Sequence, residues 1–214
     1  MALPPRAKDD LEVLTAVEAG EIVSQLALSR RVGIAVGLMN ALLKRAIRKG
    51  YVKARSAPAK RYAYYLTPKG FTEKSRLVAE YLDASLAFFR DARAQYLKLF
   101  QRASALGQKR IVLAGAGEIA EIAALAASEA DIRLLALFDP RTNQDILFGL
   151  PVIRSLNVLE RIDLAVVTDH LTPQDCYDRL IATLGSHRVM APAFLRISER
   201  GLSSKPHHAQ REAP

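Results

Sequence analysis

The sequence predicts an α+β protein with two parts joined by a long helix. Helical patterns and then an alternating hairpin pattern fill residues 1–66, which carry most of the positive charge. Residues 67–106 keep a helical period. Strand and helix patterns then alternate over residues 107–200, as in a small α/β domain with a parallel sheet. Residues 201–214 are polar and contain proline, and we expect them to form a disordered tail.

The composition predicts a soluble cytoplasmic protein. Half of the 214 residues are hydrophobic, which is enough for a buried core. No apolar run reaches the roughly 18 residues of a membrane span, and the N-terminus MALPPRAKDD lacks the apolar region of a signal peptide. The single cysteine, Cys176, excludes an intrachain disulfide and a cysteine-rich metal site. We therefore expect no metal cofactor and no membrane partner.

Positive charge is concentrated in the first half of the chain. Residues 1–110 contain 21 Lys and Arg against 9 Asp and Glu, whereas residues 111–214 contain 10 against 13. Between Glu21 and Glu73 there are eleven basic residues and no acidic one. A solvated surface normally mixes both signs, so this interval predicts a polyanionic partner, and double-stranded DNA has the matching electrostatic footprint. The alternative is a basic surface without a partner.

Three helices and a hairpin are predicted in the first part. Residues 9–18 form an amphipathic helix, and Ser24 can cap a second helix, QLALSRRV, that ends near Gly33. The third helix, AVGLMNALLKRAIRKG, has an apolar stripe made of Leu38, Leu42, Leu43, Ala46 and Ile47. Two strands follow, the first beginning at Tyr51-Val52 and the second reading YAYYLT. This order of elements is a winged helix-turn-helix.

The segments SQLALSRRVGIAVGLMNALLKRAIRKGYVKA and LTPKG resemble the winged-helix domains of MarR-like bacterial transcription regulators. The resemblance implies that the third helix enters the major groove and that the hairpin wing contacts the backbone or the minor groove. Recognition helices of this geometry present their N-terminal residues to base edges. The candidate base-contacting residues are Ala35, Val36, Gly37, Met39 and Asn40, and the candidate phosphate contacts are Lys44, Arg45, Arg48, Lys60 and Arg61. The alternative is an ordinary surface Asn40 and a solvated wing tip.

A long helix is predicted between the two parts. Thr67 can cap it and Pro68 suits its first position, while Gly107 ends it. Its apolar residues recur at alternating spacings of four and three, a heptad stripe. With Ser85 and Ala92, the stripe contains the candidate dimer contacts Val78, Leu82, Phe89, Tyr96 and Leu99. We expect a homodimer that reads paired DNA half-sites; alternatively, the stripe packs onto the chain's own domains.

The second part opens with a nucleotide-binding pattern. The strand KRIVLAG leads into Gly115-Ala116-Gly117-Glu118-Ile119-Ala120, which fits G-x-G-x-x-G/A at the start of a helix. The next strand, IRLLALFD, ends in Asp139, where an acidic residue can hold a ribose hydroxyl. Glu118 does not fit a phosphate-binding turn well. A carboxylate at the start of a helix competes with a phosphate for the positive end of the helix. A nucleotide-free domain is the alternative.

The alternation then continues. Residues 149–153 and 163–168 are predicted strands, SLNVLERI and TPQDCYDRLIATLG are predicted helices, and HRVMAPAFLRI supplies a final strand. Asp169 and His170 follow the second of these strands, at the sheet edge where ligands of open α/β sheets lie. No nucleophile motif or metal-ligand spacing accompanies them, so we favour ligand contact over catalysis. The candidate ligand-binding residues are Gly115, Ala116, Gly117, Glu118, Ile119, Asp139, Thr168, Asp169 and His170.

The order GAGEIAEIA, LLALFDP, GLPVI, DLAVVTD and RVMAPAFLRI resembles two groups. One is the redox-sensing Rex repressors, which join a winged helix to a Rossmann domain that binds NAD(H). The other is the Rossmann module of polysaccharide-biosynthesis proteins that act on nucleotide-sugars, with which Glu118 agrees better. The resemblances imply a ligand of the NAD(H) or nucleotide-sugar type.

These patterns together predict a ligand-responsive DNA-binding transcription regulator that is not an enzyme. Its second domain is expected to sense a nucleotide-type small molecule. Two alternatives remain. One is a small NAD-dependent or nucleotide-sugar-dependent enzyme with an accessory basic domain. The other is a constitutive DNA-binding dimer whose second domain binds no ligand.

Overall fold

The computed structural model describes residues 5–18, 25–57 and 61–198. The chain divides into two compact units, residues 1–89 and residues 90–214, and each is described by itself. The predicted cap Ser24 and the predicted tail lie outside the described residues. Within the described part, no single helix is long and apolar enough to cross a membrane; only α2 and α3 taken together, with a bend of 105°, meet that test of length and composition.

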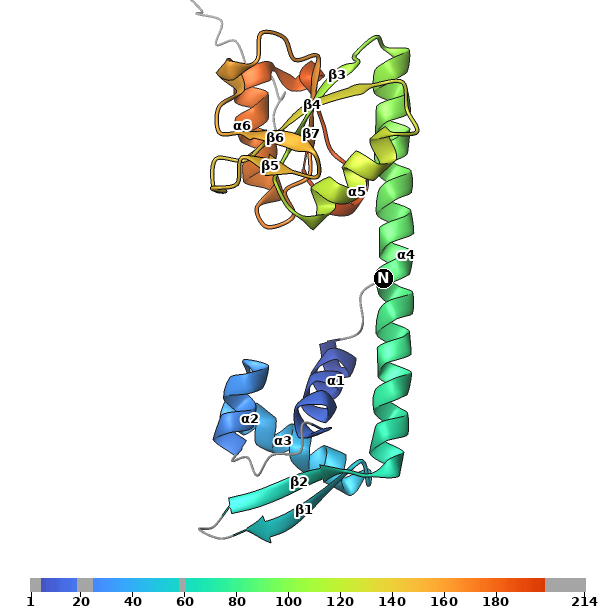
Figure 1. Cartoon of the computed structure of the whole chain (residues 1–214), viewed down its shortest axis with the longest axis vertical. Helices are drawn as coiled ribbons and strands as arrows, with labels where there is room; N and C mark the ends of the chain where they lie inside the picture. Colours follow the sequence, from blue (N-terminus) through green and yellow to red (C-terminus); the bar gives the residue numbers. More distant parts are fainter. Residues whose placement is uncertain (1–4, 19–24, 58–60, 199–214) are drawn as a thin grey trace, which may run out of the picture. The chain divides into compact units, whose positions relative to one another are not determined.

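The first unit is a three-helix bundle with an antiparallel hairpin (Figure 1). Its elements are α1 (Pro5–Glu18), α2 (Gln25–Val32), α3 (Val36–Arg48), β1 (Val52–Ala57), β2 (Arg61–Leu66) and the first part of α4 (Pro68–Ala105). Gly33, at φ +76°, supplies the left-handed residue between α2 and α3. The hairpin pairs Val52 with Leu66 and continues to Ala57 and Arg61. The predicted winged helix-turn-helix is confirmed.

The apolar face of α3 differs by one position from the predicted stripe. Met39 is fully buried, together with Leu42 and Leu43, whereas Leu38 is 44% exposed and Ile47 is 39% exposed. Adjacent residues of a helix point about 100° apart, so only one of Leu38 and Met39 faces the core. The core formed by α1, α2, β1 and β2 lies on the Met39 side. The prediction that Leu38 and Ile47 belong to the buried stripe is wrong.

The start of α4 is fastened to the end of α3. Thr67 caps α4 as predicted, because its Oγ1 accepts a hydrogen bond of 3.0 Å from the Gly70 N–H. The same hydroxyl donates to the carbonyl oxygen of Gly50 at 2.6 Å. Gly70 is required here, since an added Cβ would lie 2.0 Å from the carbonyl oxygen of Tyr51. The backbone of α4 therefore runs in direct contact with the turn that follows α3.

α4 contributes to both units and is exposed between its two contacts. Leu77 is buried in the first core. Tyr96 is fully buried in the second unit, and its hydroxyl donates to the carbonyl oxygen of Val167 at 2.9 Å. The predicted dimer role of Tyr96 is therefore wrong, because the domain's own sheet covers it. Leu99 also packs against this second core and is only partly buried.

The second unit is built around a six-stranded sheet. After the end of α4 come β3 (Arg110–Ala114), α5 (Glu118–Ala127), β4 (Arg133–Phe138), β5 (Ile146–Leu147), β6 (Leu150–Ile153), β7 (Leu164–Val167), α6 (Pro173–Leu184) and β8 (Val189–Met190). The spatial order is β5-β6-β4-β3-β7-β8. All neighbouring pairs are parallel except β5 with β6. β3, the strand before the glycine turn, therefore lies near the middle of the sheet.

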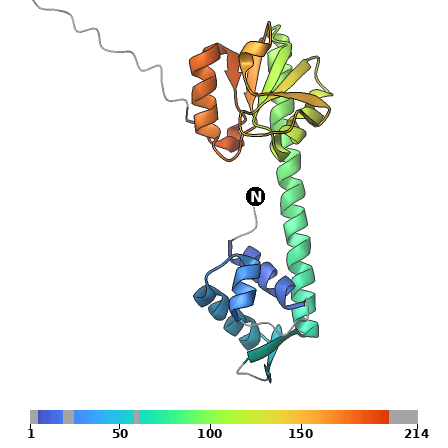
Figure 2. The ribbon, with the colours of Figure 1, turned by 60° about the vertical axis from the view of Figure 1, so that its left-hand side comes forward.

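Helices cover both faces of this sheet (Figure 2). The end of α4 and α5 pack on one face around Ile111 and Leu113, while α6 packs on the other around Val112 and Ala114. Side chains of a strand alternate between the two faces, so β3 is buried on both, as its apolar sequence predicts. The predicted helix at residues 155–162 is wrong: only a short 3-10 turn, Leu156–Val158, forms there.

Replacing Gly70 by alanine is expected to destabilise the protein by about 1–3 kcal/mol, because the new methyl group overlaps backbone that has no room to move. Urea unfolding monitored by circular dichroism measures the change. Gly37→Ala is the matched control: Gly37 also lies in a helix, and nothing lies within 4 Å of an added Cβ. That variant is expected to be unchanged or up to about 1 kcal/mol more stable. Equal effects of the two substitutions would contradict the close contact at Gly70.

Candidate functional site

The N-terminal half of α3 presents an exposed surface. Ala35, Val36, Gly37 and Leu38 are all exposed at the start of the helix. With no side chain at Gly37, another molecule can approach the helix backbone closely. Leu38 was not predicted as a contact residue; its exposure follows from the position of the core.

Two candidate contact residues of α3 are not freely exposed. The prediction for Met39 is wrong, since its side chain is fully buried in the first core. Asn40 is partly buried, and its Oδ1 accepts a hydrogen bond of 3.4 Å from Gln25 Nε2. The Gln25 amide also donates to the Tyr64 hydroxyl at 3.1 Å. Asn40 therefore belongs to a polar network between α2, α3 and β2.

Positive side chains continue along the same helix. Lys44 and Arg48 are exposed, and no ion pair joins either of them to a described acidic residue. Arg45 is half-buried and forms an ion pair with Asp10 of α1. Asp10 offsets the positive charge of Arg45, so Lys44 and Arg48 are the stronger candidates for contact with a polyanion.

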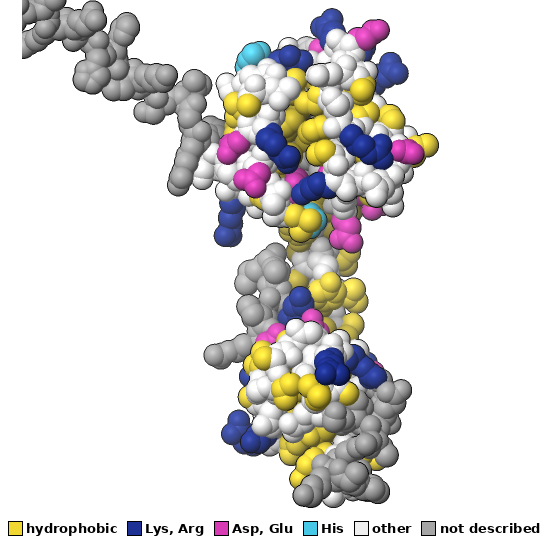
Figure 3. Space-filling model, turned by 90° about the vertical axis from the view of Figure 1, so that its left-hand side faces the viewer, with side chains coloured by type: hydrophobic (Ala, Val, Ile, Leu, Met, Phe, Trp, Pro, Cys, Tyr) yellow, Lys and Arg dark blue, Asp and Glu magenta, His cyan; other side chains and the backbone are white. Residues whose placement is uncertain are grey.

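The hairpin carries exposed cations and aromatic rings. Lys53 and Arg55 are exposed on β1, and Tyr62 and Tyr65 are about half-exposed on β2. The Arg55 guanidinium lies 5.9 Å from the centre of the Tyr65 ring. The predicted contact Lys60 and the side chain of Arg61 lie outside the described residues. On the face of the first unit seen in Figure 3, Lys and Arg side chains predominate over Asp and Glu.

A second candidate site lies at the carboxyl ends of β3, β4 and β7. This crevice, here called the glycine-turn crevice, has a volume of about 330 Å³. It is lined by Gly115, Ala116, Gly117, Asp139, Arg141, Thr142, Thr168, Asp169, His170 and Leu171. The structure thus brings together seven of the nine predicted ligand-binding residues. Arg141, Thr142 and Leu171 were not predicted.

The turn after β3 is tightly packed. Gly115 has φ +114°, and an added Cβ would lie 2.4 Å from the backbone nitrogen of Asp169. Thr168 Oγ1 donates to the Gly115 carbonyl oxygen at 2.7 Å. Only glycine fits at this position, because both the backbone angle and the neighbouring strand end exclude a side chain. Gly117 is open by comparison: the nearest atom to an added Cβ is His170 Cε1 at 3.9 Å.

Arg141 joins two buried carboxylates at the crevice. Its Nε lies 3.1 Å from Asp139 Oδ1, and its Nη2 lies 2.8 Å from Asp169 Oδ2. Asp139 Oδ2 also accepts a hydrogen bond of 3.0 Å from the Ala116 N–H. One of the backbone donors that this kind of turn offers to a phosphate is therefore occupied by the protein's own carboxylate.

Both carboxyl groups keep their charge despite burial. Burial alone would raise the pKa of Asp139, but hydrogen bonds from Arg141 and the Ala116 N–H outweigh it, so its pKa is lowered. The pKa of Asp169 is lowered in the same way, chiefly by backbone N–H donors in the turn before α6. The crevice therefore holds two carboxylates and one guanidinium at neutral pH.

The two remaining predicted residues lie outside the crevice lining. The side chain of Ile119 is 7% exposed and packs in the apolar core. Glu118 is exposed at the first position of α5. His170, in contrast, is exposed and lies beside Gly117 at the mouth of the crevice.

Cys176 lies behind the crevice on α6. It is 5% exposed, and its thiol lies 3.8 Å from the Ala114 carbonyl oxygen. Burial raises the pKa of this thiol to about 11, so it is protonated at neutral pH. Among residues 5–18, 25–57 and 61–198, no three His, Cys, Asp or Glu side chains form a group that could hold a metal ion.

Several solved structures have some similarity to the chain. The PcaV transcriptional regulator from Streptomyces coelicolor, in complex with its natural ligand, is 22% identical over 45% of this chain and 73% of its own, with a TM-score of 0.36. MepR, a transcription regulator of the Staphylococcus aureus multidrug efflux pump MepA, is 14% identical over 37% of this chain, with a TM-score of 0.33. The match spans 61% of MepR, which is less than two thirds of its length.

A third similar structure is that of ZitR, a zinc-responsive MarR family member from Lactococcus lactis. It is 16% identical over 50% of this chain and 76% of its own, with a TM-score of 0.33. A comparison with curated protein sequences finds no significant match.

One family matches part of the first unit. Residues 10–53 match the family described as winged helix-turn-helix DNA-binding. The matched segment extends from α1 to the start of β1, and so contains α2 and α3. This part of the chain is therefore similar to winged helix-turn-helix DNA-binding domains.

Proposed function

We propose that the protein is a dimeric DNA-binding transcription regulator of the MarR type, whose second unit binds a nucleotide-type ligand. The observation that carries the proposal is the exposed start of α3, followed on the same helix by Lys44 and Arg48. It lies within the segment that matches winged helix-turn-helix DNA-binding domains. The same unit carries the one-signed basic interval of the sequence.

The exposed residues of the first unit suit the two tasks of a DNA interface. Small and apolar side chains at the start of α3 allow close approach to base edges and to the thymine methyl group. Lys44 and Arg48 lie further along the helix and suit phosphate contacts, which position the helix without reading the sequence. On the wing, Lys53 and Arg55 extend the same positive charge.

A dimer is supported by an apolar surface on α4, here called the α4 seam. It consists of Val78, Tyr81, Leu82, Leu86, Phe88 and Phe89, whose exposed fractions range from 37% to 53%. Six such side chains offer roughly 500 Å² of apolar surface per copy, compared with about 800 Å² per partner in a standard interface. An exposed apolar surface of this size on one helix segment favours dimerisation, in which a second copy of the chain covers it. Of the predicted dimer contacts, Val78, Leu82 and Phe89 belong to the seam.

The ligand proposal rests on the topology of the second unit. In chain order, its five parallel strands lie side by side as third, second, first, fourth and fifth. This is the order of dinucleotide-binding Rossmann sheets, in which ligands lie at the carboxyl ends beside the first strand. The glycine-turn crevice lies at that place, and Asp139 stands where such domains hold a ribose hydroxyl.

The charges of the crevice bear on the ligand type, NAD(H) or a nucleotide-sugar. Two buried carboxylates are hydrogen-bond acceptors of the kind that ribose and sugar hydroxyl groups bind, and a ligand hydroxyl here would replace one of their present donors, such as Arg141 or Thr172. Because Asp139 occupies the Ala116 N–H, a phosphate finds fewer backbone donors at this turn. Arg141 is the cationic side chain among the lining residues, and His170 offers a ring nitrogen for hydrogen bonding; both suit a phosphate. This arrangement favours a hydroxyl-rich nucleotide-sugar over a fully seated pyrophosphate.

For DNA binding, replacing both Lys44 and Arg48 by alanine is expected to weaken binding to all sequences. The slope of log K against log salt should become shallower by about one for each lost phosphate contact. Fluorescence anisotropy over a salt series measures this. Arg133→Ala is the control, since Arg133 is an exposed arginine of the second unit. An unchanged salt slope in the double variant would contradict the assignment of α3.

Asn40→Ala is expected to act differently, by reducing the preference for operator over random DNA. Each base contact contributes about 1–3 kcal/mol of discrimination. Competition binding with operator and scrambled duplexes separates a loss of sequence preference from a uniform loss of DNA affinity. Equal weakening on both duplexes would assign Asn40 a structural role within the Gln25 and Tyr64 network.

For the dimer, Leu82→Glu is expected to raise the dissociation constant at least tenfold, because the interface would bury an unpaired charge. Sedimentation equilibrium measures it. Ala87→Glu is the matched control: it introduces the same charge at an exposed position of the same helix, outside the α4 seam. Equal dimer dissociation constants for Leu82→Glu and Ala87→Glu would show that the α4 seam is not the dimer interface.

For the ligand, NADH, NAD⁺ and UDP-glucose are the probes, and calorimetry measures their binding. One of them is expected to bind the unaltered chain and to change its affinity for DNA in a shift assay. Gly117→Val should abolish that binding while the fold survives, because the added atoms enter the crevice rather than the core. No binding by any probe would leave a constitutive DNA-binding dimer, and equal binding by the variant would place the ligand outside the glycine-turn crevice.

A further inference from the structure

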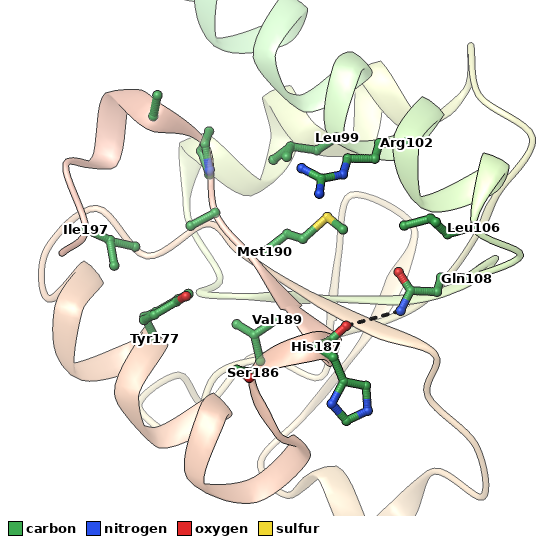
Figure 4. A pocket seen from close by; sticks show the side chains of 13 residues that line it. Leu99, Arg102, Leu106, Gln108, Tyr177, Ser186, His187, Val189, Met190 and Ile197 are labelled. Atoms are coloured by element: carbon green, nitrogen blue, oxygen red, sulfur yellow. Dashed lines mark hydrogen bonds between the residues drawn. The ribbon is translucent and has the colours of Figure 1, made fainter. Parts of the chain in front are cut away.

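The second unit has a larger hollow that is separate from the glycine-turn crevice. This hollow, here called the β8 groove, has a volume of about 880 Å³ and lies between the end of α4, the strand β8 and α6 (Figure 4). No residue lines both hollows. Its volume falls within the range of ligand sites, about 300–1,000 Å³.

Apolar side chains from several elements form one part of the wall of the β8 groove, and polar atoms form about as much of its surface. Leu99 and Leu106 come from α4, Val189 and Met190 from β8, and Ile197 from the segment after the final 3-10 turn. β8 is the last strand at its edge of the described sheet, so the groove takes the place that a further element would cover. An apolar body is therefore the part of a ligand that these walls would bind.

One cation faces this apolar surface. Arg102 extends from α4 over the groove, toward Met190 (Figure 4). It forms no ion pair with a described acidic side chain, and none of the lining residues is acidic. The imidazole of His187 points away from Arg102 in the same view. The groove thus combines an apolar wall with one available guanidinium, which suits an anionic group.

Gln108 adds a second polar feature at the wall. Its Nε2 donates to the His187 carbonyl oxygen at 3.2 Å, which fixes the orientation of the amide. Its Oε1 is buried and has no hydrogen-bond partner within the described part of the chain. A buried acceptor without a donor costs free energy, but this atom is closed to solvent, so Gln108 serves the groove as a fixed part of its wall.

We infer that the β8 groove binds an amphipathic anion: a molecule with an apolar body against Leu99, Leu106 and Met190 and an acidic head group at Arg102. This inference is independent of the proposed nucleotide site, since the two hollows share no residue. The protein would then carry a binding site for an acyl or aryl carboxylate in addition to the glycine-turn crevice.

Calorimetric titration of the full-length protein with sodium decanoate tests the inference. Decanoate should bind saturably with one site per chain, whereas acetate, which lacks the apolar body, and decyltrimethylammonium, which carries the opposite charge, should not. Arg102→Gln should weaken decanoate binding about tenfold or more, and Arg102→Lys should weaken it less. Arg133→Gln is the control for loss of an exposed arginine in the same unit.

Three results would overturn the inference. Equal affinity of Arg102→Gln and the unaltered protein would remove the role of the cation. Equal binding of decyltrimethylammonium would indicate an unspecific apolar surface. A change in sedimentation of Arg102→Gln without a change in decanoate affinity would make the groove an interface between copies. Leu82→Glu should leave decanoate binding unchanged, which separates the groove from the α4 seam.

Discussion

One helix supplies side chains to two hydrophobic cores, one in each unit of the chain. α4 places Leu77 in the core of the first unit and Tyr96 in the core of the second. Every other element belongs to one unit only. The side chains of the α4 seam lie between these two contacts and are covered by neither core. The predicted heptad stripe therefore serves two purposes in succession: exposed apolar surface first, and internal packing afterwards.

Signals that act over a few residues predicted the elements well. Thr67 and Pro68 mark the start of α4, because capping involves only the first turn of a helix. The position of the buried face of α3 was not predicted, since Leu38 and Met39 are adjacent and both apolar. The choice between them depends on α1 and the hairpin, which are distant in sequence and decide which side of α3 is covered.

The same distinction applies to the sites. Gly115, Asp139 and Asp169 could be predicted because each lies within two residues of the end of a strand, and the ends of parallel strands meet at one edge. Arg141 was missed, although it follows Asp139 by two positions. Its role appears only when β4 and β7 are known to flank β3, which brings the carboxylates of Asp139 and Asp169 within reach of one guanidinium. Pairing across the sheet is not a local property of the sequence.

The junction at Thr67 gives the first unit a mechanical property. The Thr67 hydroxyl donates to the Gly50 carbonyl oxygen, and the Thr67 N–H donates to the Tyr51 carbonyl oxygen at 2.9 Å. Gly70 packs so closely against the Tyr51 carbonyl group that no side chain fits there. No hinge separates the end of α3 from the start of α4. The turn after α3 and the start of α4 therefore form one packed junction, and a displacement of either helix end would have to break these backbone contacts.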